Sequence, residues 1–444
     1  MNQTRLSIAI LLVLLMGAGW VTVLGGQASQ SAAQSEAAEA ARRYRDQELY
    51  AMSIQSYEQA LTQSPSSALY QETIEVYDAY YAQTATSAVR RDFADLLSRA
   101  CGDCPKEEAF WERYVRLYLE REDYSQAAQV LRRAQRAGVS SQTLEEQYIQ
   151  VYYAWDAGYQ SYLQILPGSW DGCYVIQDRE GWGTVTSSGG TMLSAVYPYM
   201  GPISLDGQVV VTDGSGESWL MNDAGMPMVH YQAPAAQAGC WSEGLVPILP
   251  QGEDTWSYFS DDGQAVLSGY LEAGSFQDGQ AAVRTGEGWQ IIDAQGQIAE
   301  EGVWEDIRLD PAGRYEQDGV ILAKSGGSWG IYSGSWKQAE GFQCDDIDYY
   351  AGGAIAFCRD GLWGFVDEDG EEIIAPAYDQ ARSFSGGVAA VCRDGLWGFI
   401  DEAGEVVVDF QFADAGSFSP DDGSCPVQQE ENGPYEIIQW AVAR

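Results

Sequence analysis

Few residues in this chain carry the chemistry that a catalytic centre needs. His230 is the only histidine among 444 residues, so Ser-His-Asp or Cys-His catalysis and a histidine-rich metal site are nearly excluded. The sequence also contains no Walker-type phosphate loop and no G-x-G-x-x-G between a strand and a helix. We therefore interpret His230 as an ordinary surface or core residue and expect no enzymatic activity.

Acidic turns are the remaining candidates for chemistry. Carboxylates gather in four places, three of them directly before a glycine: Asp261-Asp262-Gly263, Asp345-Asp346, Asp367-Glu368-Asp369-Gly370 and Asp421-Asp422-Gly423. None has the twelve-residue spacing with a distal Glu that an EF-hand calcium loop requires. Turn chemistry explains these carboxylates, and weak calcium binding stays open as the alternative. We expect no other cofactor or metal.

The eight cysteines raise the question of disulfides and redox chemistry. Cys101 and Cys104 form a C-x-x-C motif, but they lie in a turn between expected helices with no βαβ pattern around them. We interpret them as a local disulfide or a free pair, with a redox or metal role as the alternative. Cys358 and Cys392 occupy the same position of consecutive repeat units, where an apolar strand residue is expected, and are interpreted as core residues.

An internal repeat organises the second half of the chain. The segment from Cys392 to Gly404 is nearly identical to the segment from Cys358 to Gly370. Each unit contains one aromatic residue at an equivalent place, and these are about 36 residues apart on average: Trp182, Trp219, Trp256, Trp289, Trp329, Trp363, Trp397 and Tyr435. A period of this length predicts a propeller, a solenoid or an array, in which each unit packs only against its neighbours.

The local pattern of the repeat predicts four short strands. Asp394-Gly395 suits a two-residue hairpin turn, because both residues tolerate the positive φ that such a turn needs. Residues 388–393 and 396–401 then form paired strands. Both faces of these strands are apolar, as expected for a blade packed between two others. We predict a β-propeller of seven or eight blades, with an open stack of β-hairpins as the alternative. The repeat tryptophans are interpreted as structural, and a sugar-stacking role is the alternative.

This region resembles the WG-repeat family of bacterial proteins. The copy most similar to the family pattern contains Trp363-Gly364-Phe365-Val366-Asp367, Gly370, Pro376, Tyr378-Asp379 and Phe384. Glycine follows the tryptophan at positions 183, 330, 364 and 398, but it is replaced in the other units by Leu220, Ser257, Gln290 and Glu436. Those four units diverge from the family pattern.

Residues 36–165 have a helical pattern, with few glycines and apolar residues at three- and four-residue spacing. Ala60, Ala100 and Ala134 are 40 and 34 residues apart, and the segments around them resemble the second helix of tetratricopeptide repeats. The resemblance implies an α-solenoid of about three helical pairs with a groove for a peptide or partner protein. A helical spacer is the alternative. Pro167-Gly168-Ser169 marks the boundary with the β-domain, expected over residues 167–444.

The N-terminus carries a long apolar run. Residues 6–24 are apolar apart from Ser7, Thr22 and glycines, and a single Arg5 precedes them. This length can span a hydrocarbon core of about 30 Å, and the position of Arg5 directs the rest of the chain away from the cytoplasm. We predict a signal anchor, a transmembrane helix within residues 1–26, followed by a spacer over residues 27–35. Cleavage near Ala28 and secretion is the alternative.

Charge restricts the partners. The formal net charge is −41, and residues 167–444 hold 10 Lys/Arg against 45 Asp/Glu. Such a field repels nucleic acid and anionic lipid, so no nucleic-acid partner is expected. The sequence predicts a bacterial, single-pass membrane protein whose extracytoplasmic part is a non-enzymatic scaffold, binding a protein partner through helical and WG repeats. Two alternatives stay open: a module that binds cell-wall or extracellular glycan, and a carboxylate-based glycoside hydrolase.

Overall fold

The computed structural model describes residues 36–168 and 170–442. The chain divides after Ala154 into two compact units, a helical unit and a β unit. Helices end at Tyr152 and strands begin at Trp155. The β structure therefore starts before the boundary that the sequence predicts at residues 165–167, and that boundary is corrected to Ala154.

The helical unit is a row of helices in which each contacts the next. After a helical stretch over residues 36–46, the helices are α2 (Tyr50–Gln63), α3 (Ser67–Thr84), α4 (Ser87–Asp103), α5 (Glu108–Leu119), α6 (Tyr124–Arg136) and α7 (Gln142–Tyr152). Side chains of Ser66 and Thr86 accept hydrogen bonds from the first turns of α3 and α4, which fixes where these helices begin. The small Ala60, Ala100 and Ala134 are fully or almost fully buried, so neighbouring helices approach closely. The tetratricopeptide-like character of this unit stays a prediction.

The predicted membrane anchor needs correction. In residues 36–168 and 170–442, no helix combines the length and the apolar character needed to cross a bilayer. Residues 1–26, on which the anchor prediction rested, lie outside the described part of the chain. The fold class is therefore corrected to a helical unit followed by an all-β unit, and the single-pass membrane location is withdrawn.

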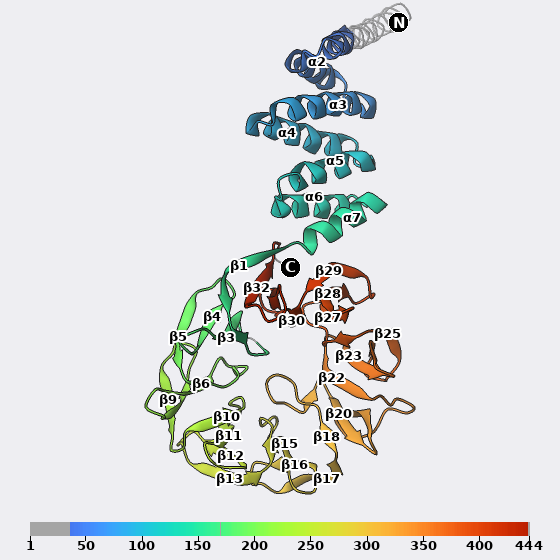
Figure 1. Ribbon diagram of the computed structural model, residues 1–444. Helices are drawn as coiled ribbons and strands as arrows, with labels where there is room; N and C mark the ends of the chain where they lie inside the picture. Colours follow the sequence, from blue (N-terminus) through green and yellow to red (C-terminus); the bar gives the residue numbers. More distant parts are fainter. Residues whose placement is uncertain (1–35, 169, 443–444) are drawn as a thin grey trace, which may run out of the picture. The chain divides into compact units, whose positions relative to one another are not determined.

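The β unit contains eight four-stranded sheets in its described residues, and they are arranged around a ring (Figure 1). In chain order the strands of blades 1 to 4 are β2 (Gln164–Ile165), β3 (Cys173–Gln177), β4 (Trp182–Thr186), β5 (Thr191–Tyr197); β6 (Tyr199–Met200), β7 (Val209–Thr212), β8 (Ser218–Met221), β9 (Pro227–Tyr231); β10 (Ala235–Ala238), β11 (Leu245–Pro250), β12 (Trp256–Ser260), β13 (Ala265–Tyr270); β14 (Glu272–Ala273), β15 (Gln280–Arg284), β16 (Trp289–Asp293) and β17 (Ile298–Trp304).

Blades 5 to 8 continue the pattern with two variations. Their strands are β18 (Asp306–Ile307), β19 (Glu316–Gln317), β20 (Val320–Ser325), β21 (Ser328–Ser333); β22 (Asp346–Ala351), β23 (Ala354–Arg359), β24 (Leu362–Val366), β25 (Glu372–Tyr378); β26 (Gln380–Ala381), β27 (Val388–Arg393), β28 (Leu396–Asp401), β29 (Val406–Phe412); β30 (Asp414–Ala415), β31 (Ser424–Gln428), β32 (Tyr435–Trp440) and β1 (Trp155–Tyr162). In blade 5, isolated bridges of Gln338 and Cys344 to β21 replace the outermost strand.

Blade 8 closes the ring, because its strands come from both ends of the β unit. β30, β31 and β32 are the last strands of the chain, whereas the outer strand β1 precedes blade 1. Antiparallel pairing joins Trp155 to Trp440 and Tyr162 to Tyr435. The structure is thus an eight-bladed propeller and not the open stack of hairpins.

Within a blade the predicted hairpin is present. Asp394 and Gly395 have φ values of 53° and 79°, and they connect β27 to β28 with the expected bounds. The amide of Asp394 donates to the carboxylate of Asp379 at 2.7 Å. Asp360 and Asp345 repeat this contact one blade earlier at 2.8 Å. In both blades, the aspartate that directly precedes the innermost strand therefore holds the hairpin turn of the next two strands.

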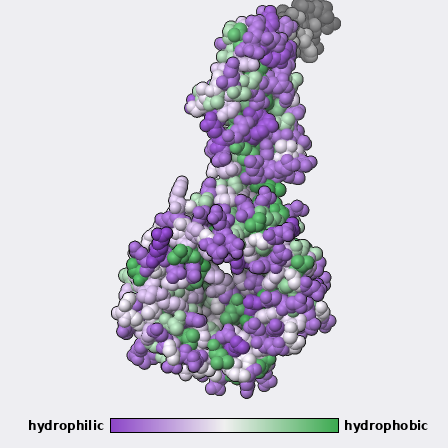
Figure 2. All heavy atoms as spheres, viewed as in Figure 1, coloured by the Kyte–Doolittle hydropathy of each residue, from purple (hydrophilic) through white to green (hydrophobic). Residues whose placement is uncertain are grey.

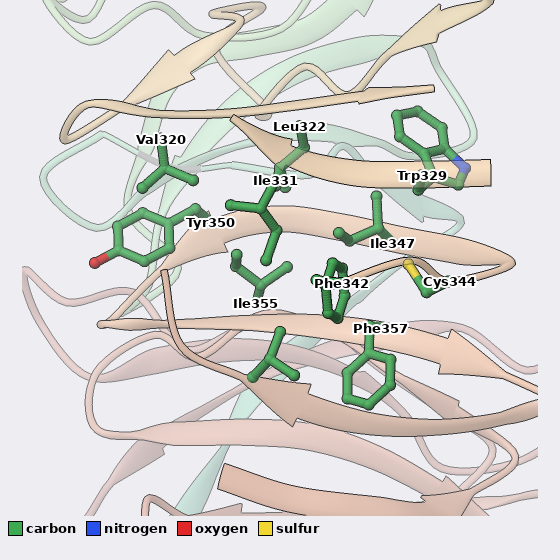
Figure 3. Packing of buried hydrophobic residues seen from close by; sticks show 11 residues of the cluster. Val320, Leu322, Trp329, Ile331, Phe342, Cys344, Ile347, Tyr350, Ile355 and Phe357 are labelled. Atoms are coloured by element: carbon green, nitrogen blue, oxygen red, sulfur yellow. The ribbon is translucent and has the colours of Figure 1, made fainter. Parts of the chain in front are cut away.

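Apolar side chains of adjacent blades form the core between them. Figure 3 shows one such layer, where Leu322 and Ile331 of blade 5 face Ile347 and Phe357 of blade 6. Similar clusters lie between the other blades, for example around Val391 between blades 6 and 7. Each side chain here is almost completely removed from water, so a blade is stabilised mainly by its two neighbours.

The glycine that follows the repeat tryptophan has a steric cause. In blade 6, Trp363 pairs with Tyr378 but Phe365 pairs with Ile374, so the outer strand makes a bulge opposite Gly364. A Cβ on Gly364 would lie 2.5 Å from the carbonyl oxygen of Ile374 and 2.7 Å from the amide nitrogen of Pro376. Any larger residue would force the two backbones apart.

We predict that Gly364→Ala lowers the free energy of unfolding by about 1–3 kcal/mol, because the new methyl group meets fixed backbone atoms. The matched control is Gly286→Ala, where a Cβ meets nothing within 4 Å and a change within about 0.5 kcal/mol is expected. Denaturant unfolding followed by tryptophan fluorescence measures both. Equal effects of the two substitutions would contradict the steric explanation.

Candidate functional site

The repeat aromatic residues are spread around the ring and do not form one site. In blades 1 to 7 the tryptophan begins a strand or lies one residue inside it, in the third strand of each blade except blade 5, where Trp329 lies in β21. In blade 8, Tyr435 begins β32. Trp289, Trp329 and Trp397 are buried, and the other tryptophans of the set are half-buried. Of the eight, only Tyr435 lines the central cavity described below.

The acidic turns are held by their own backbone. The carboxylate of Asp367 accepts the amides of Asp369 and Glu371 at 3.0 and 2.8 Å, and that of Asp262 accepts the amide of Gln264 at 3.1 Å. Such contacts define turn geometry rather than a ligand site. Across residues 36–168 and 170–442, no group of three or more His, Cys, Asp or Glu side chains is placed to hold a metal ion.

His230 and the eight cysteines lie at different places in the two units. His230 stacks on Trp219, with ring centroids 4.4 Å apart, and its Nε2 lies 2.6 Å from the carboxylate of Glu217 on the exposed side of blade 2. All eight cysteines are free thiols. Burial raises the pKa of Cys101 to about 12, so this thiol stays protonated at neutral pH and is a poor nucleophile.

An equivalent position lies directly after the innermost strand of each blade, or third in β22, and in blades 1, 5, 6, 7 and 8 it lines the central cavity described below. We call it the channel position, and its occupants from blade 1 to blade 8 are Leu166, Gly201, Gly239, Gly274, Arg308, Asp348, Arg382 and Gly416. Four blades thus present glycine, whereas blades 5, 6 and 7 present Arg, Asp and Arg in succession.

In blade 4, Gly274 makes room for a loop from blade 5. This central loop, residues 309–314, follows β18 and contacts the walls of other blades. The carbonyl of Gly313 accepts the amide of Ser275 at 2.8 Å, and a Cβ on Gly274 would lie 2.7 Å from that same carbonyl oxygen. The Cβ of Pro311 approaches blade 1, 3.3 Å from the place where a Cβ of Gly168 would lie. The loop therefore occupies part of the channel.

The remainder of the channel is a cavity of about 620 Å³. Blades 1, 2, 5, 6, 7 and 8 and the central loop contribute its walls. Figure 2 shows a hollow in the middle of the propeller face, bordered mostly by hydrophilic residues. The wall combines apolar residues such as Leu205 and Phe418 with three arginines and three aspartates. A volume in this range is typical of sites that hold a small molecule or part of a chain.

Arginine and aspartate side chains tie successive blades together around this cavity. Arg308 of blade 5 donates to Asp346 of blade 6 at 2.7 Å, and Arg382 of blade 7 donates to Asp414 of blade 8 at 3.0 Å. Between them, Asp348 of blade 6 accepts the amide and the hydroxyl of a serine in blade 7, Ser383, at 2.8 and 2.9 Å. The charged channel positions are therefore anchored on one side and exposed to the cavity on the other.

The central loop is fixed by a buried carboxylate. Asp310 is 8% exposed and accepts hydrogen bonds from the Arg314 backbone amide and Nε, each at 2.8 Å. Charge-assisted pairs of this geometry are among the stronger hydrogen bonds in proteins. The loop is consequently part of the cavity wall with a defined conformation.

Two of the three tyrosines in the wall, Tyr349 and Tyr435, remain protonated at neutral pH. Burial and the hydrogen bond to Asp414 at 2.6 Å raise the pKa of Tyr435 to about 12. Burial, with the nearby charge of Asp348, raises the pKa of Tyr349 to about 12. Neither hydroxyl is poised for proton transfer near neutral pH.

Sequence reasoning missed the channel positions and the central loop. A signal was present, because the units aligned on their aromatic residue have glycine in four copies where Arg308, Asp348 and Arg382 stand in three others. These positions come from different blades and are brought together only when the ring closes. The pattern of a single repeat unit therefore could not identify them as part of a site.

Two segments of the chain, residues 363–397 and 397–432, match the family described as "WG containing repeat". Residues 363–432 therefore contain WG repeats, as the sequence predicts. Each match begins at the tryptophan of a third strand and runs into the following blade, so the sequence repeat is out of phase with the blade. No curated protein sequence matches this chain.

Solved β-propellers show a distant likeness. The Dos1 propeller is 10% identical with a TM-score of 0.41, covering 66% of this chain and 95% of its own. Hsv2 from Kluyveromyces lactis is 8% identical with a TM-score of 0.37, covering 60% and 93%. The Cps50 (Swd1) propeller domain from Myceliophteria thermophila is 10% identical with a TM-score of 0.35, covering 64% and 99%. Likeness at this level carries no argument, and the propeller assignment rests on the eight sheets.

Tyr435 predicts a pH effect on stability. Its pKa of about 12 in the folded protein lies above the value of about 10 in an unfolded chain. The contribution of the neutral phenol is therefore complete below about pH 10 and is lost between about pH 10 and 12. We expect the thermal stability advantage of the wild type over Tyr435→Phe to shrink across that interval. A constant difference between their melting temperatures from about pH 9 to 12 would contradict this assignment.

Proposed function

We propose that this chain is a non-enzymatic scaffold protein that binds a segment of a partner protein in the central cavity of its propeller. The observation that carries the proposal is the cavity itself, whose polar side chains are held in fixed positions by neighbouring blades. A rigid, preformed wall reduces the loss of conformational entropy on binding. The helical unit offers a second surface for the same or another partner.

Binding is favoured over catalysis by the state of the cavity side chains. The carboxylates of Asp310, Asp348 and Asp414 each accept two or more hydrogen bonds from neighbouring groups. Glycoside hydrolysis needs one carboxyl group that gives up a proton and a second that attacks or activates water. Carboxylates engaged in this way support a structural and ligand-positioning role, so we do not carry the hydrolase alternative forward.

A polypeptide is the ligand class that fits this wall best. The wall alternates apolar surface with hydrogen-bond donors and acceptors, as a main chain with its side chains requires. A glycan would need exposed aromatic platforms, yet the repeat tryptophans lie one to a blade and outside the cavity. The net charge of −41 disfavours nucleic acid.

We predict that filling the cavity abolishes partner binding. Ser385 lines the cavity, so a tryptophan at this position would occupy the space meant for the partner. Immobilised full-length protein and its Ser385→Trp variant are used to capture proteins from an extract of the source organism, followed by mass spectrometry. The expected result is a defined protein retained by the wild type and lost from the variant.

The matched control is Ser268→Trp, which places the same side chain on the exposed outer strand of blade 3. This variant should retain the partner. Retention of the partner by both variants would show that binding occurs elsewhere and would contradict the proposed function, as would the absence of any retained protein.

A further inference from the structure

The cavity has an imbalance between hydrogen-bond donors and acceptors. Its three aspartates are satisfied: Asp414, for example, accepts from Arg382, from the Ala415 amide at 2.9 Å and from Tyr435. A guanidinium carries five N–H donors, but Arg308 makes one hydrogen bond, to Asp346. Its Nε is buried without a hydrogen-bond partner in the described structure. Arg382 makes two hydrogen bonds, to Asp414 and to the Ala415 carbonyl. Both arginines therefore keep N–H donors that a ligand with lone pairs can use.

The arginines are preorganised to use this capacity. The guanidinium carbon of Arg308 lies 5.0 Å from the centre of the Trp329 ring, and that of Arg382 lies 4.9 Å from the centre of the Trp397 ring. Each is also fixed by its aspartate in the next blade. A stacked and tethered guanidinium loses little entropy when it binds a planar oxygen pair, and it suits carboxylate or phosphate better than lysine does.

The distribution of charge points to the same ligand. Residues 167–444 contain only 10 Lys/Arg against 45 Asp/Glu, and Arg308, Arg314 and Arg382 all line this one cavity. Solvent-exposed charges further away than a Debye length of about 8 Å are largely screened at physiological salt. The field at the cavity is therefore set by its own three arginines and three aspartates more than by the net charge of the chain, and the aspartates already accept hydrogen bonds from their neighbours.

We propose that the cavity binds an anionic oxygen group of the partner polypeptide through Arg308 and Arg382, with Arg314 on the central loop as a third donor. The group is a carboxylate of an acidic segment or the phosphate of a phosphorylated one. The proposal rests on the proposed function, because it names the chemistry of the ligand for the same cavity.

The test uses the full chain and three tetrapeptides that differ only in the side chain, blocked at both ends: four glutamates, four glutamines and four phosphoserines. Isothermal calorimetry measures their binding. We expect the glutamate or the phosphoserine peptide to bind and the glutamine peptide to bind at least about tenfold more weakly, because only the anions accept charge-assisted hydrogen bonds. Whichever anionic peptide binds more tightly identifies the source of the oxygen group.

Variants locate the site. The double variant Arg308→Gln/Arg382→Gln should weaken the anionic peptide at least about tenfold. Arg284→Gln, which changes an exposed arginine of blade 4 paired with Glu272, should leave binding unchanged. Because loss of two ties between blades could destabilise the ring, Arg308→Lys/Arg382→Lys is measured as well. It keeps both charges but loses the guanidinium fork, and we expect at least about a threefold loss with an unchanged melting temperature.

The outcomes separate this proposal from the proposed function. Equal affinity for the glutamate and glutamine peptides, or unchanged binding by the arginine variants, would overturn the anionic ligand while leaving a cavity that binds polypeptide. The absence of binding by all three peptides would also overturn it. Capture of the partner and its sensitivity to Ser385→Trp are judged independently of these peptides.

Discussion

The pairing of β1 with β32 is the interaction on which the rest of the β unit depends. Every blade buries its apolar faces against two neighbours, so a ring with an open joint would leave two faces in water. The joint is closed by a strand from the start of the β unit, with Trp155 opposite Trp440 and Tyr162 opposite Tyr435. Separating blades 1 and 8 therefore requires breaking a ladder of backbone hydrogen bonds as well as an apolar contact.

Closure also creates the site. Once the ring is closed, the channel positions of several blades lie around one cavity, and their side chains determine the shape and polarity of its wall. In blade 4 the residue at this position is Gly274, and the central loop contacts Ser275 beside it. The charged residues of blades 5, 6 and 7 reach sideways to the next blade and leave their other edges in the cavity. The same residues thus join blades and line the cavity.

Local features of the fold could be predicted, but long-range ones could not. The hairpin of β27 and β28 follows from Asp394-Gly395 and from apolar residues on both sides, and the eight aromatic positions correspond to eight blades. The prediction that both faces of these strands are packed fails at Leu396, which is 43% exposed because it begins its strand at the hairpin end. β1 was missed because it carries no repeat aromatic of the set and reads as polar. The membrane anchor, inferred from apolar length alone, was corrected. The cavity is lined by residues of six different blades, so the sequence of a single repeat unit cannot predict it.

The measurement that tests the central claim most directly is photo-crosslinking from inside the cavity. Leu205 lines the cavity and is 57% exposed, so benzoylphenylalanine in its place would face a bound segment. The same group in place of Val266, 51% exposed on the outer strand of blade 3, is the control. We predict one crosslinked protein in the source organism from position 205 and none from position 266. The same products from both positions, or none from position 205, would contradict the account.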